Sequence, residues 1–550
     1  GTMARRDLVL GIDSSTQGTT AVLLSRDDWS QAGCARVGYR EIGASLGLSP
    51  ETQAPLLAPL ESGEASQPPE LYTRALGAVF DALGPDLLGR VAAINISAQQ
   101  HGQVWLSESG AEAIASLAGP EREFRAHFPD GDPASLPPGA FALGRAPIWM
   151  CSNTGAEAAR IRDFAGGRAA VTELSGSDSP LRFSGAVLRR MAKRFPAAYG
   201  ETCKVHLISS FLTAYLSGRP EAPIDWGNGA GMSLMNYSAR RWDSILAEAV
   251  AGDLPGGAEG LARRLPGLTH PLAVTGAVAP RLAERYGFAP DCLVVAGSGD
   301  NPQSKVLASG TLLSLGTSFV LMSPGTRPDP QANAMYDGTG EPFVFGCRTN
   351  GALVWEAIRL RHGIASGDFA SSDAALASLP AGTADPDFIF QPEAESFPES
   401  PPTGAKFSQI AFPGSFAAEY AGVVDSSLGL MYLASASFAG KTGEVAVTGG
   451  AAASAAVLAR VAAFWDAPVS AISEAGASTG AAVAAGAALA GAALAGAASR
   501  REILEEARMR AGRRRMRVEP DAEAVRAAHG PGGYLERLAE RFAERFGSAW

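Results

Sequence analysis

The chain has 550 residues, 46% of them hydrophobic and 19% charged, so it is too long for one hydrophobic core and too apolar to be disordered. We therefore expect two or three folded domains. Its 46 lysines and arginines against 56 aspartates and glutamates give a net charge of −10, which argues against nucleic acid or an anionic membrane as a partner.

The first predicted element is a β-hairpin near the start of the chain. Two apolar runs, Leu8–Asp13 and Thr20–Leu24, flank a turn of Ser, Thr, Gln and Gly residues that exposes backbone N–H groups and hydroxyls. Further along, the apolar pattern predicts a helix at Glu70–Leu83 and a buried strand at Val91–Ile96. The region Ala111–Pro138 is rich in Pro, Gly and acidic residues and predicts an irregular surface excursion.

The second half of the chain repeats this order of features. A strand at Cys292–Gly297 leads into a Ser-Gly-Asp-Asn sequence, and Thr311–Leu321 again places a polar Gly, Thr and Ser turn between two apolar runs. This repetition is weak, but it predicts two related α/β halves with a cleft between them.

Changes in amino-acid composition along the chain indicate a domain boundary and two distinct segments. Leu265–Pro280 is dense in Pro and Gly, and a boundary there gives predicted domains of residues 1–275 and 276–550. The acidic stretch Ser371–Pro402 predicts a loop-rich surface insertion. The uncharged stretch Ala475–Ser499 is almost entirely Ala and Gly, which contribute little to membrane insertion, so we expect a helix that packs closely against a neighbour inside a soluble core.

The cysteines and the spacing of potential metal ligands limit the kinds of site that the chain can form. The five cysteines are scattered and never form a C-x-x-C pair, which favours a reducing, cytoplasmic location over a disulfide scaffold. No His, Cys, Asp and Glu cluster has the spacing of a protein-only metal cage. Polar turns of the kind described above hold phosphate oxygens, and a nearby carboxylate holds Mg²⁺ through water. One such turn is most often an ordinary hairpin, but two at equivalent places could cradle ATP.

Two other motifs match only weakly. Residues Gly476–Gly480 fit the nucleophile-elbow pattern G-x-S-x-G, and a hydrolase built on Ser478 would need Asp521 and His529 as partners. Gly440-Lys441-Thr442 resembles the end of a P-loop, but the required first glycine is missing. Such short patterns arise readily in a chain with 64 glycines.

Eight short blocks together resemble the FGGY carbohydrate kinases, and among them the xylulose kinase branch. In chain order they are Leu10–Gln17, Gln99–Gly102, Pro147–Met150, Leu181–Gly185, Ile224–Met232, Gly299–Pro302, Ser314–Ser318 and Thr448–Ala451. The blocks are collinear and span nearly the whole chain. The resemblance implies an α/β fold of two actin-like (ribonuclease H-like) ATPase domains, with the sugar site and first phosphate hairpin in the N-terminal domain and the nucleotide site and catalytic aspartate in the C-terminal domain.

The resemblance also implies roles for single residues. Asp300 matches the catalytic base, which takes the proton of a sugar hydroxyl as the γ-phosphoryl group of ATP arrives. The implied substrate-binding residues are Gln100, His101, Arg182, Asp300 and Asn301. The implied ATP-binding residues are Asp13, Thr16, Gly316, Thr317, Gly449, Gly450, Ala451 and Ser454. Asp13 would also orient Mg²⁺ through water. Without the resemblance, the favoured interpretation of Asp300 is a helix cap and that of His101 is a buried, hydrogen-bonded histidine.

The expected reaction is transfer of the γ-phosphoryl group of MgATP to the terminal hydroxyl of a ketopentose, D-xylulose. Three departures from the family pattern bear on it: Thr20 stands where a Lys or Arg is usual, Cys151 where Asp is common, and Ser454 where Asn is usual. They leave open a kinase for another ketose or polyol, such as ribulose, a tetrulose or a glycerol-like compound, and a sugar- or nucleotide-binding homologue with reduced turnover. We expect no nucleic-acid or membrane partner, and a monomer or homodimer.

Overall fold

The computed structural model describes residues 5–403, 414–439, 442–472, 476–493 and 497–547. The chain folds as two compact units, each of which gathers segments that are distant in sequence. Unit 1 comprises Gly1–Leu307, Met335–Glu341 and Gly476–Ala511. Unit 2 comprises Ala308–Ala334, Pro342–Ala475 and Gly512–Trp550.

Unit 1 is built on a sheet that contains seven strands among the described residues. They are β1 (Leu8–Ser14), β2 (Gly18–Ser25), β3 (Gln31–Gly38), β5 (Val91–Ala98), β13 (Val274–Ala277), β14 (Leu293–Val295) and β15 (Ser298–Gly299). The order is β13-β14-β5-β1-β2-β3, with β15 also paired to β5. β1 is antiparallel to β2 and parallel to β5, and both central strands are apolar because both faces of the sheet are covered.

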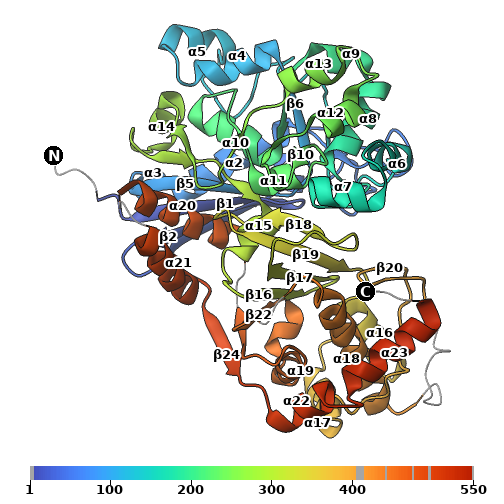
Figure 1. The fold of residues 1–550 in the computed structure, drawn as a ribbon. Coiled ribbons are helices and arrows are strands. Elements are labelled where there is room, and N and C mark those ends of the chain that lie inside the picture. The colour runs from blue at the N-terminus through green and yellow to red at the C-terminus, as the bar shows by residue number, and fades with distance from the viewer. Residues whose placement is uncertain (1–4, 404–413, 440–441, 473–475, 494–496, 548–550) are drawn as a thin grey trace. The chain divides into compact units, whose positions relative to one another are not determined.

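Helices cover both faces of this sheet. α2 (Glu70–Leu83) and α10 (Ile208–Ser217) share a hydrophobic core with the side chains of Leu8, Leu10 and Ile12. On the opposite face, α20 (Ala477–Ala493) lies along β1 (Figure 1). The helix comes this close because Gly11 has no side chain: a Cβ there would lie 1.9 Å from the carbonyl oxygen of Ser478.

The rest of unit 1 consists of short strands and helices around a second apolar cluster, which includes residues of α6, α8, α12 and α13. The helices are α1 (Tyr39–Ile42), α3 (Pro85–Leu88), α4 (Glu108–Ser116), α5 (Glu121–His127), α6 (Gly155–Phe164), α7 (Arg168–Ser175), α8 (Ser184–Arg194), α9 (Pro196–Glu201), α11 (Trp226–Ala230), α12 (Ser244–Ala251), α13 (Gly257–Arg264), α14 (Pro280–Tyr286), α15 (Asp300–Lys305) and α21 (Ala497–Ala511). The strands are β4 (Ser66–Gln67), β6 (Gln103–Ser107), β7 (Ala146–Pro147), β8 (Thr202–Leu207), β9 (Ile224–Asp225), β10 (Met235–Asn236), β11 (Arg241–Trp242) and β12 (Leu268–Thr269).

A second sheet forms the centre of unit 2, and its described strands run in the order β18-β19-β17-β16-β22-β23-β24. Their bounds are β16 (Thr311–Leu315), β17 (Phe319–Pro324), β18 (Asn333–Tyr336), β19 (Pro342–Arg348), β22 (Val445–Thr448), β23 (Val469–Ile472) and β24 (Arg514–Val518), and β20 (Glu395–Ser396) and β21 (Glu399–Ser400) form a separate small ribbon. The helices are α16 (Ala352–Arg361), α17 (Phe369–Ser378), α18 (Phe416–Ser435), α19 (Ala455–Trp465), α22 (Ala522–His529) and α23 (Tyr534–Phe546), with the 3-10 helix η2 (Gly450–Ala453). The last two residues of β18 belong to unit 1.

The structure confirms the α/β class and the main predicted elements. The helix at Glu70–Leu83 has the predicted bounds, and the strand expected at Val91–Ile96 is β5. Both polar turns join antiparallel strands, β1 with β2 and β16 with β17. The alanine-rich stretch contributes α20, which packs through its small residues as expected. None of the helices in the described ranges combines the length and the apolar character needed to cross a membrane.

Three sequence-based expectations differ from the structure. Ala111–Pro138 is not irregular throughout, since it holds most of α4 and all of α5; the Ser107 hydroxyl caps α4 and Ile114 anchors it in the core. Ser371–Pro402 includes most of α17 and the β20–β21 ribbon. The boundary placed after residue 275 falls inside β13, because β13, β14 and β15 complete the sheet of unit 1.

Candidate functional site

The first hairpin places a carboxylate beside its polar turn. Asp13 is the last residue but one of β1, and Ser97 of the parallel strand β5 donates a hydrogen bond to its Oδ1 at 2.8 Å. Withdrawal of the carboxyl group from water raises the pKa of Asp13 to about 6, and the Ser97 hydroxyl partly opposes this shift. A carboxylate with only one described hydrogen bond keeps lone pairs that can accept from water molecules around a cation.

The turn after Asp13 is fixed by side chains from three other segments. Trp149 Nε1 donates to Thr16 Oγ1 at 2.9 Å, and that hydroxyl donates to Gln99 Oε1 at 3.2 Å. Gln99 Nε2 donates in turn to Gln67 Oε1 at 2.8 Å. The sequence blocks that contain Gln99 and Trp149 were recognised, but neither residue was given a role there; only the fold brings both to Thr16.

Asp300, Asn301 and Gln100 form a contiguous polar group in unit 1. Asp300 opens α15, where the backbone N–H of Asn301 donates to its Oδ1 at 2.9 Å. Asn301 Nδ2 donates to Gln100 Oε1 at 3.0 Å. Gln100 follows β5 and Asp300 follows β15, two parallel strands whose carboxyl ends lie together. The fold thus assembles three of the five predicted sugar-binding residues.

The carboxyl group of Asp300 has a strongly perturbed titration. Desolvation and, to a smaller extent, the negative charge of Asp13 raise its pKa to about 7, although hydrogen bonds from backbone N–H groups, including those of Asn301 and Gln100, partly oppose the change. The influence of Asp13 means that the two carboxyl groups lie within electrostatic range of each other inside unit 1. A carboxylate with a pKa near 7 is a stronger base than an ordinary aspartate and is still largely ionised above neutral pH.

His101 is held neutral in a left-handed backbone conformation. Its φ is 69°, its Nδ1 lies 2.8 Å from the carbonyl oxygen of Gly231, and its ring stacks on Phe183 at 4.6 Å. Burial, followed by the charge of Arg182, lowers the pKa of His101 to about 3. Because a carbonyl only accepts, Nδ1 carries the proton and Nε2 is left as an acceptor.

Arg182 lies beside this stack, with its guanidinium carbon 5.8 Å from the Phe183 ring centroid. Its charge reaches His101, so the fold groups these two predicted sugar-binding residues as well. Both residues contact the Phe183 ring. The sequence block that contains Phe183 gave no sign of this role.

A buried network supports the strand that leads to Asp300. Asp225 caps α11 by accepting from the backbone N–H groups of Gly227 and Asn228, and Ser298 Oγ donates to Asp225 Oδ2 at 2.5 Å. Ser298 lies two residues before Asp300 on β15. The network therefore ties the start of α15 to a second, independent segment of unit 1.

The predicted adenosine turn and the second phosphate turn lie together in unit 2. Gly316 and Thr317 occupy the turn between β16 and β17, and β16 is parallel to β22, which Gly449 follows. Gly449 has φ 94°, and a Cβ there would lie 2.6 Å from the carbonyl oxygen of Leu315. Both the left-handed conformation and the close approach require glycine. Ala451, in η2, continues the same turn.

Ser454 has a structural partner in this turn. Its hydroxyl caps α19 by accepting from the N–H of Val457 and donates to Asp373 Oδ1 at 2.5 Å. Gly450 precedes it in η2. The predicted ATP-binding residues thus divide into Asp13 and Thr16 in unit 1 and the remaining six in unit 2. Asp300 lies in unit 1, not in the C-terminal domain expected from the sequence, because β15 pairs with β5.

The departures at positions 20 and 151 have different surroundings. Thr20 pairs with Asp13 across the hairpin and supplies no charge. Cys151 is buried in an apolar cluster with Ile148 and donates from Sγ to the carbonyl oxygen of Ala65 at 3.2 Å. Its thiol has an elevated pKa, chiefly from burial. Cys151 is therefore part of the core behind the Trp149 segment.

Magnesium fits this site only through water. Within the described ranges, no three or more His, Cys, Asp or Glu side chains gather in a way that could hold a metal ion directly. Mg²⁺ keeps most of its waters and takes one or two carboxylates besides phosphate oxygens. Asp13 provides one such carboxylate beside the turn and would hold the ion by its hydration shell.

The hydrolase alternative fails on geometry within unit 2. Asp521 caps the start of α22 and His529 ends it. Eight residues of α-helix separate them by about 12 Å, which is far beyond hydrogen-bond distance. His529 Nε2 lies near two main-chain carbonyl oxygens, those of Ala463 and Phe464, at 3.1 and 3.0 Å. Of the P-loop-like sequence, residues 440–441 lie outside the described residues.

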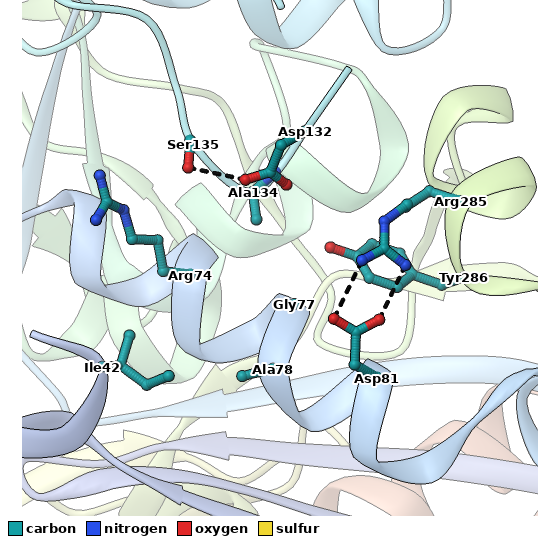
Figure 2. A pocket seen from close by; sticks show the side chains of 10 residues that line it. All are labelled: Ile42, Arg74, Gly77, Ala78, Asp81, Asp132, Ala134, Ser135, Arg285 and Tyr286. Atoms are coloured by element: carbon teal, nitrogen blue, oxygen red, sulfur yellow. Dashed lines mark hydrogen bonds and ion pairs between the residues drawn. The ribbon is translucent and has the colours of Figure 1, made fainter. Parts of the chain in front are cut away.

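A pocket of about 340 Å³ lies elsewhere in unit 1, against α2 (Figure 2). Three of its charged side chains are engaged with neighbours: Arg285 binds Asp81 through two nitrogens at 2.9 and 3.1 Å, and Ser135 Oγ donates to Asp132 at 2.9 Å. None of the predicted site residues lines it. We therefore place the candidate site at the ends of β1, β5 and β15.

Comparison with solved structures defines the class of fold. The xylulose kinase from Rhodospirillum rubrum superposes with a TM-score of 0.75 at 17% identity, covering 98% of each chain. The glycerol kinase from Plasmodium falciparum, solved with ADP, gives a TM-score of 0.71 at 12% identity, again over 98% of each chain. The protein thus has the two-unit α/β fold of carbohydrate kinases.

The sequence comparisons agree with the resemblance. Residues 141–306 match the model of the FGGY family of carbohydrate kinases, N-terminal domain. The probable D-xylulose kinase A of Aspergillus flavus is 32% identical over 309 residues, or 54% of this chain and 51% of the relative. The match thus spans about half the length of the curated relatives. The resemblance seen in the sequence is confirmed.

Proposed function

We propose that the protein is an ATP-dependent sugar kinase that phosphorylates the terminal hydroxyl of a ketopentose, D-xylulose. The observation that carries this proposal is a polar group in unit 1, which consists of Asp300, Asn301, Gln100 and His101. The negative charge of Asp13 acts on the carboxyl group of Asp300. It combines a basic carboxylate with neutral donors and acceptors, which is what deprotonation of a polyhydroxyl ligand requires.

In the proposed reaction, Asp300 takes the proton of the sugar hydroxyl. The hydroxyl oxygen forms a bond to the γ-phosphorus of ATP, and the bond from that phosphorus to the bridging β–γ oxygen breaks, which releases ADP. The pKa of Asp300, raised to about 7, matches a base that works near neutral pH. Mg²⁺, held through water at Asp13, would neutralise charge on the phosphates.

Recognition of the sugar is assigned to three other residues. His101 Nε2 accepts a hydrogen bond from one hydroxyl, because Nδ1 is engaged with Gly231. The Arg182 guanidinium presents several donors to neighbouring oxygens, and Asn301 supplies an amide next to the base. In unit 2, the turn at Gly316 and Thr317 would hold phosphate oxygens, and the turn at Gly449 would accommodate adenosine.

D-xylulose is the proposed substrate because curated relatives of about 30% identity carry that activity in their names. A second candidate function, binding of sugar and nucleotide with reduced turnover, is favoured by one observation: Thr20 leaves the first hairpin without the cation usual in the family. The following assay also distinguishes a kinase that acts on another ketose or polyol.

The test is ADP release from MgATP measured across D-xylulose, D-ribulose, an erythrulose and glycerol, with Asp300→Asn beside the wild type. We expect saturable ADP release with D-xylulose. In the variant we expect the rate of ADP release to fall about a thousandfold, because removing a general base lowers the rate by several orders of magnitude. Asp86→Asn, at an exposed aspartate of α3, serves as the matched control. Release with a different sugar would move the substrate assignment, and sugar and ATP binding without release would favour the second candidate.

A further inference from the structure

The strand register offers a replacement for the cation that Thr20 lacks. Asp13 on β1 pairs directly with Thr20 on β2, and Thr20 pairs directly with Arg36 on β3. Directly paired residues of antiparallel strands project from the same face of a sheet. We propose that the Arg36 guanidinium binds the β- and γ-phosphates of ATP at the first hairpin. This inference rests on the proposed kinase function.

Asp13, Thr20 and Arg36 form a row across three neighbouring strands, and the distance along this row suits an arginine. Neighbouring strands lie about 4.8 Å apart, so the Cα atoms of Asp13 and Arg36 are about 10 Å apart. Thr20, between them, has a short side chain that leaves the row open. A lysine or arginine at position 20 would reach the phosphates from the adjacent strand, and a long side chain from position 36 reaches the same space from one strand further away.

Arg36 is also available for a ligand. It is exposed, and it makes no ion pair or side-chain hydrogen bond with any residue in the described ranges. Two other arginines of unit 1 are occupied by protein groups: Arg90 binds Asp7 through two nitrogens at 3.0 and 2.8 Å, and Arg40 donates to the carbonyl oxygens of Ser49 and Ala54. An exposed arginine alone is ordinary surface; its position in the row of Asp13 sets Arg36 apart.

The face that carries the row is the one on which α20 begins. Gly11 precedes Asp13 by two residues and so shares its face, and its close approach to Ser478 marks the first turn of α20 there. Asp13 lies beyond that turn, toward the end of β1. The positive end of the helix dipole thus points to the same side of the sheet as Arg36, and both favour an anionic ligand beside Asp13.

The role assigned to Arg36 is electrostatic. Its N–H groups donate to non-bridging oxygens of the phosphates and stabilise the charge that develops on them during transfer. Arg36 forms no covalent bond and moves no proton. Loss of a charge-assisted pair of this kind corresponds to about a 10- to 100-fold loss of affinity for the polyphosphate.

Four variants test the proposal: Arg36→Gln, Thr20→Lys, the double variant, and Arg122→Gln as a control. Arg122 is an exposed arginine of α5 that, like Arg36, has no ion pair among the described residues. Affinities for MgATP and for adenosine are measured by calorimetry, together with kcat and KM for ATP. We expect Arg36→Gln to weaken MgATP binding about 10- to 100-fold with adenosine binding unchanged, and Thr20→Lys to restore it in the double variant.

The outcomes separate this inference from the proposed function. Phosphoryl transfer by the wild type, with MgATP affinity unchanged in Arg36→Gln, overturns the inference and leaves the function standing. A loss of MgATP affinity in Arg36→Gln, with no transfer to any sugar, supports the inference and removes the function. An equal loss in Arg122→Gln would show a general charge effect and overturn the role of Arg36, as would a wild type that does not bind MgATP.

Discussion

The two polar hairpins have the same construction but different side chains. In each, the last residue but one of the first strand lies beside a hydroxyl residue of a parallel strand: Asp13 beside Ser97 in unit 1, and Ser314 beside Thr448 in unit 2. Across the antiparallel pair, Asp13 faces Thr20, whereas Ser314 faces the apolar Val320.

Under the proposed function, this difference assigns two chemical tasks to one scaffold. The hairpin of unit 1 carries a carboxylate with a raised pKa and, through Arg36, a cation on the third strand, where unit 2 has Cys347. The hairpin of unit 2 offers hydroxyl and backbone groups without a charge at the equivalent place. We infer that the acid, metal and proton chemistry belongs to unit 1, and that unit 2 supplies neutral contacts to the nucleotide.

Replacing the carboxylate is the strongest test of the comparison. Asp13→Asn keeps the size of the side chain, and Asp13→Ser gives the first hairpin the residue type of the second. We expect either change to lower turnover of MgATP and sugar about a hundredfold, because the hydrated Mg²⁺ loses its anchor. Ser314→Ala, at the equivalent place, should lower it by less than about tenfold. Equal effects at the two positions would contradict the division of tasks.

The close approach of α20 is a second feature that distinguishes the hairpins. In unit 2, Leu312 holds the place of Gly11, two residues before Ser314. Gly11→Ala puts a Cβ against backbone atoms of Ser478 and Ala482, so strand and helix must separate, at a cost of about 3 kcal/mol in the free energy of unfolding. Chemical denaturation measures this loss. Gly144→Ala, at an exposed glycine with open space around it, is the control and should change stability little.

The smallest expected effect is a pH dependence of stability at Asp13. Its folded-state pKa is raised to about 6, so the folded state prefers the protonated form. The stability that this group contributes is fully present below its unfolded pKa near 4 and is lost as the pH rises through about 6. The Asp13→Asn side chain does not titrate. The Tm of this variant minus that of the wild type should therefore increase by a few degrees as the pH is raised from 4.5 to 7.5. A constant difference in Tm over that range would show that Asp13 is not desolvated as described.

Much of the fold was predictable because it depends on local sequence. The α2 helix could be located from its apolar spacing and both hairpins from their turn residues, since neighbouring residues decide these elements. The helices α4 and α5 were missed, because Pro and Gly around them hid short segments whose stability comes from packing, as at Ile114. The domain boundary was misplaced because a late strand, β15, adds to an early sheet.

The candidate site was only partly accessible from the sequence. Its blocks pointed to Asp300, His101 and Arg182, and the fold groups these residues with others in unit 1. No sequence signal gave the stack of His101 on Phe183 or the bond from Trp149 to Thr16, because both join residues far apart in the chain. Cys151, which stands where the family commonly has Asp, is held in an apolar core, and only the packing of the folded chain shows this.

The sequence by itself determined the class of fold, the polar turns and the residue types suited to phosphate and sugar chemistry, because these are carried by local patterns and by collinear motifs. The tertiary structure alone decided which unit holds Asp300, how α20 reaches β1 over Gly11, and that Arg36 stands in the row of Asp13 and Thr20. Those features depend on strand register and on contacts between segments hundreds of residues apart, and their free energy is gained only when the whole sheet is assembled.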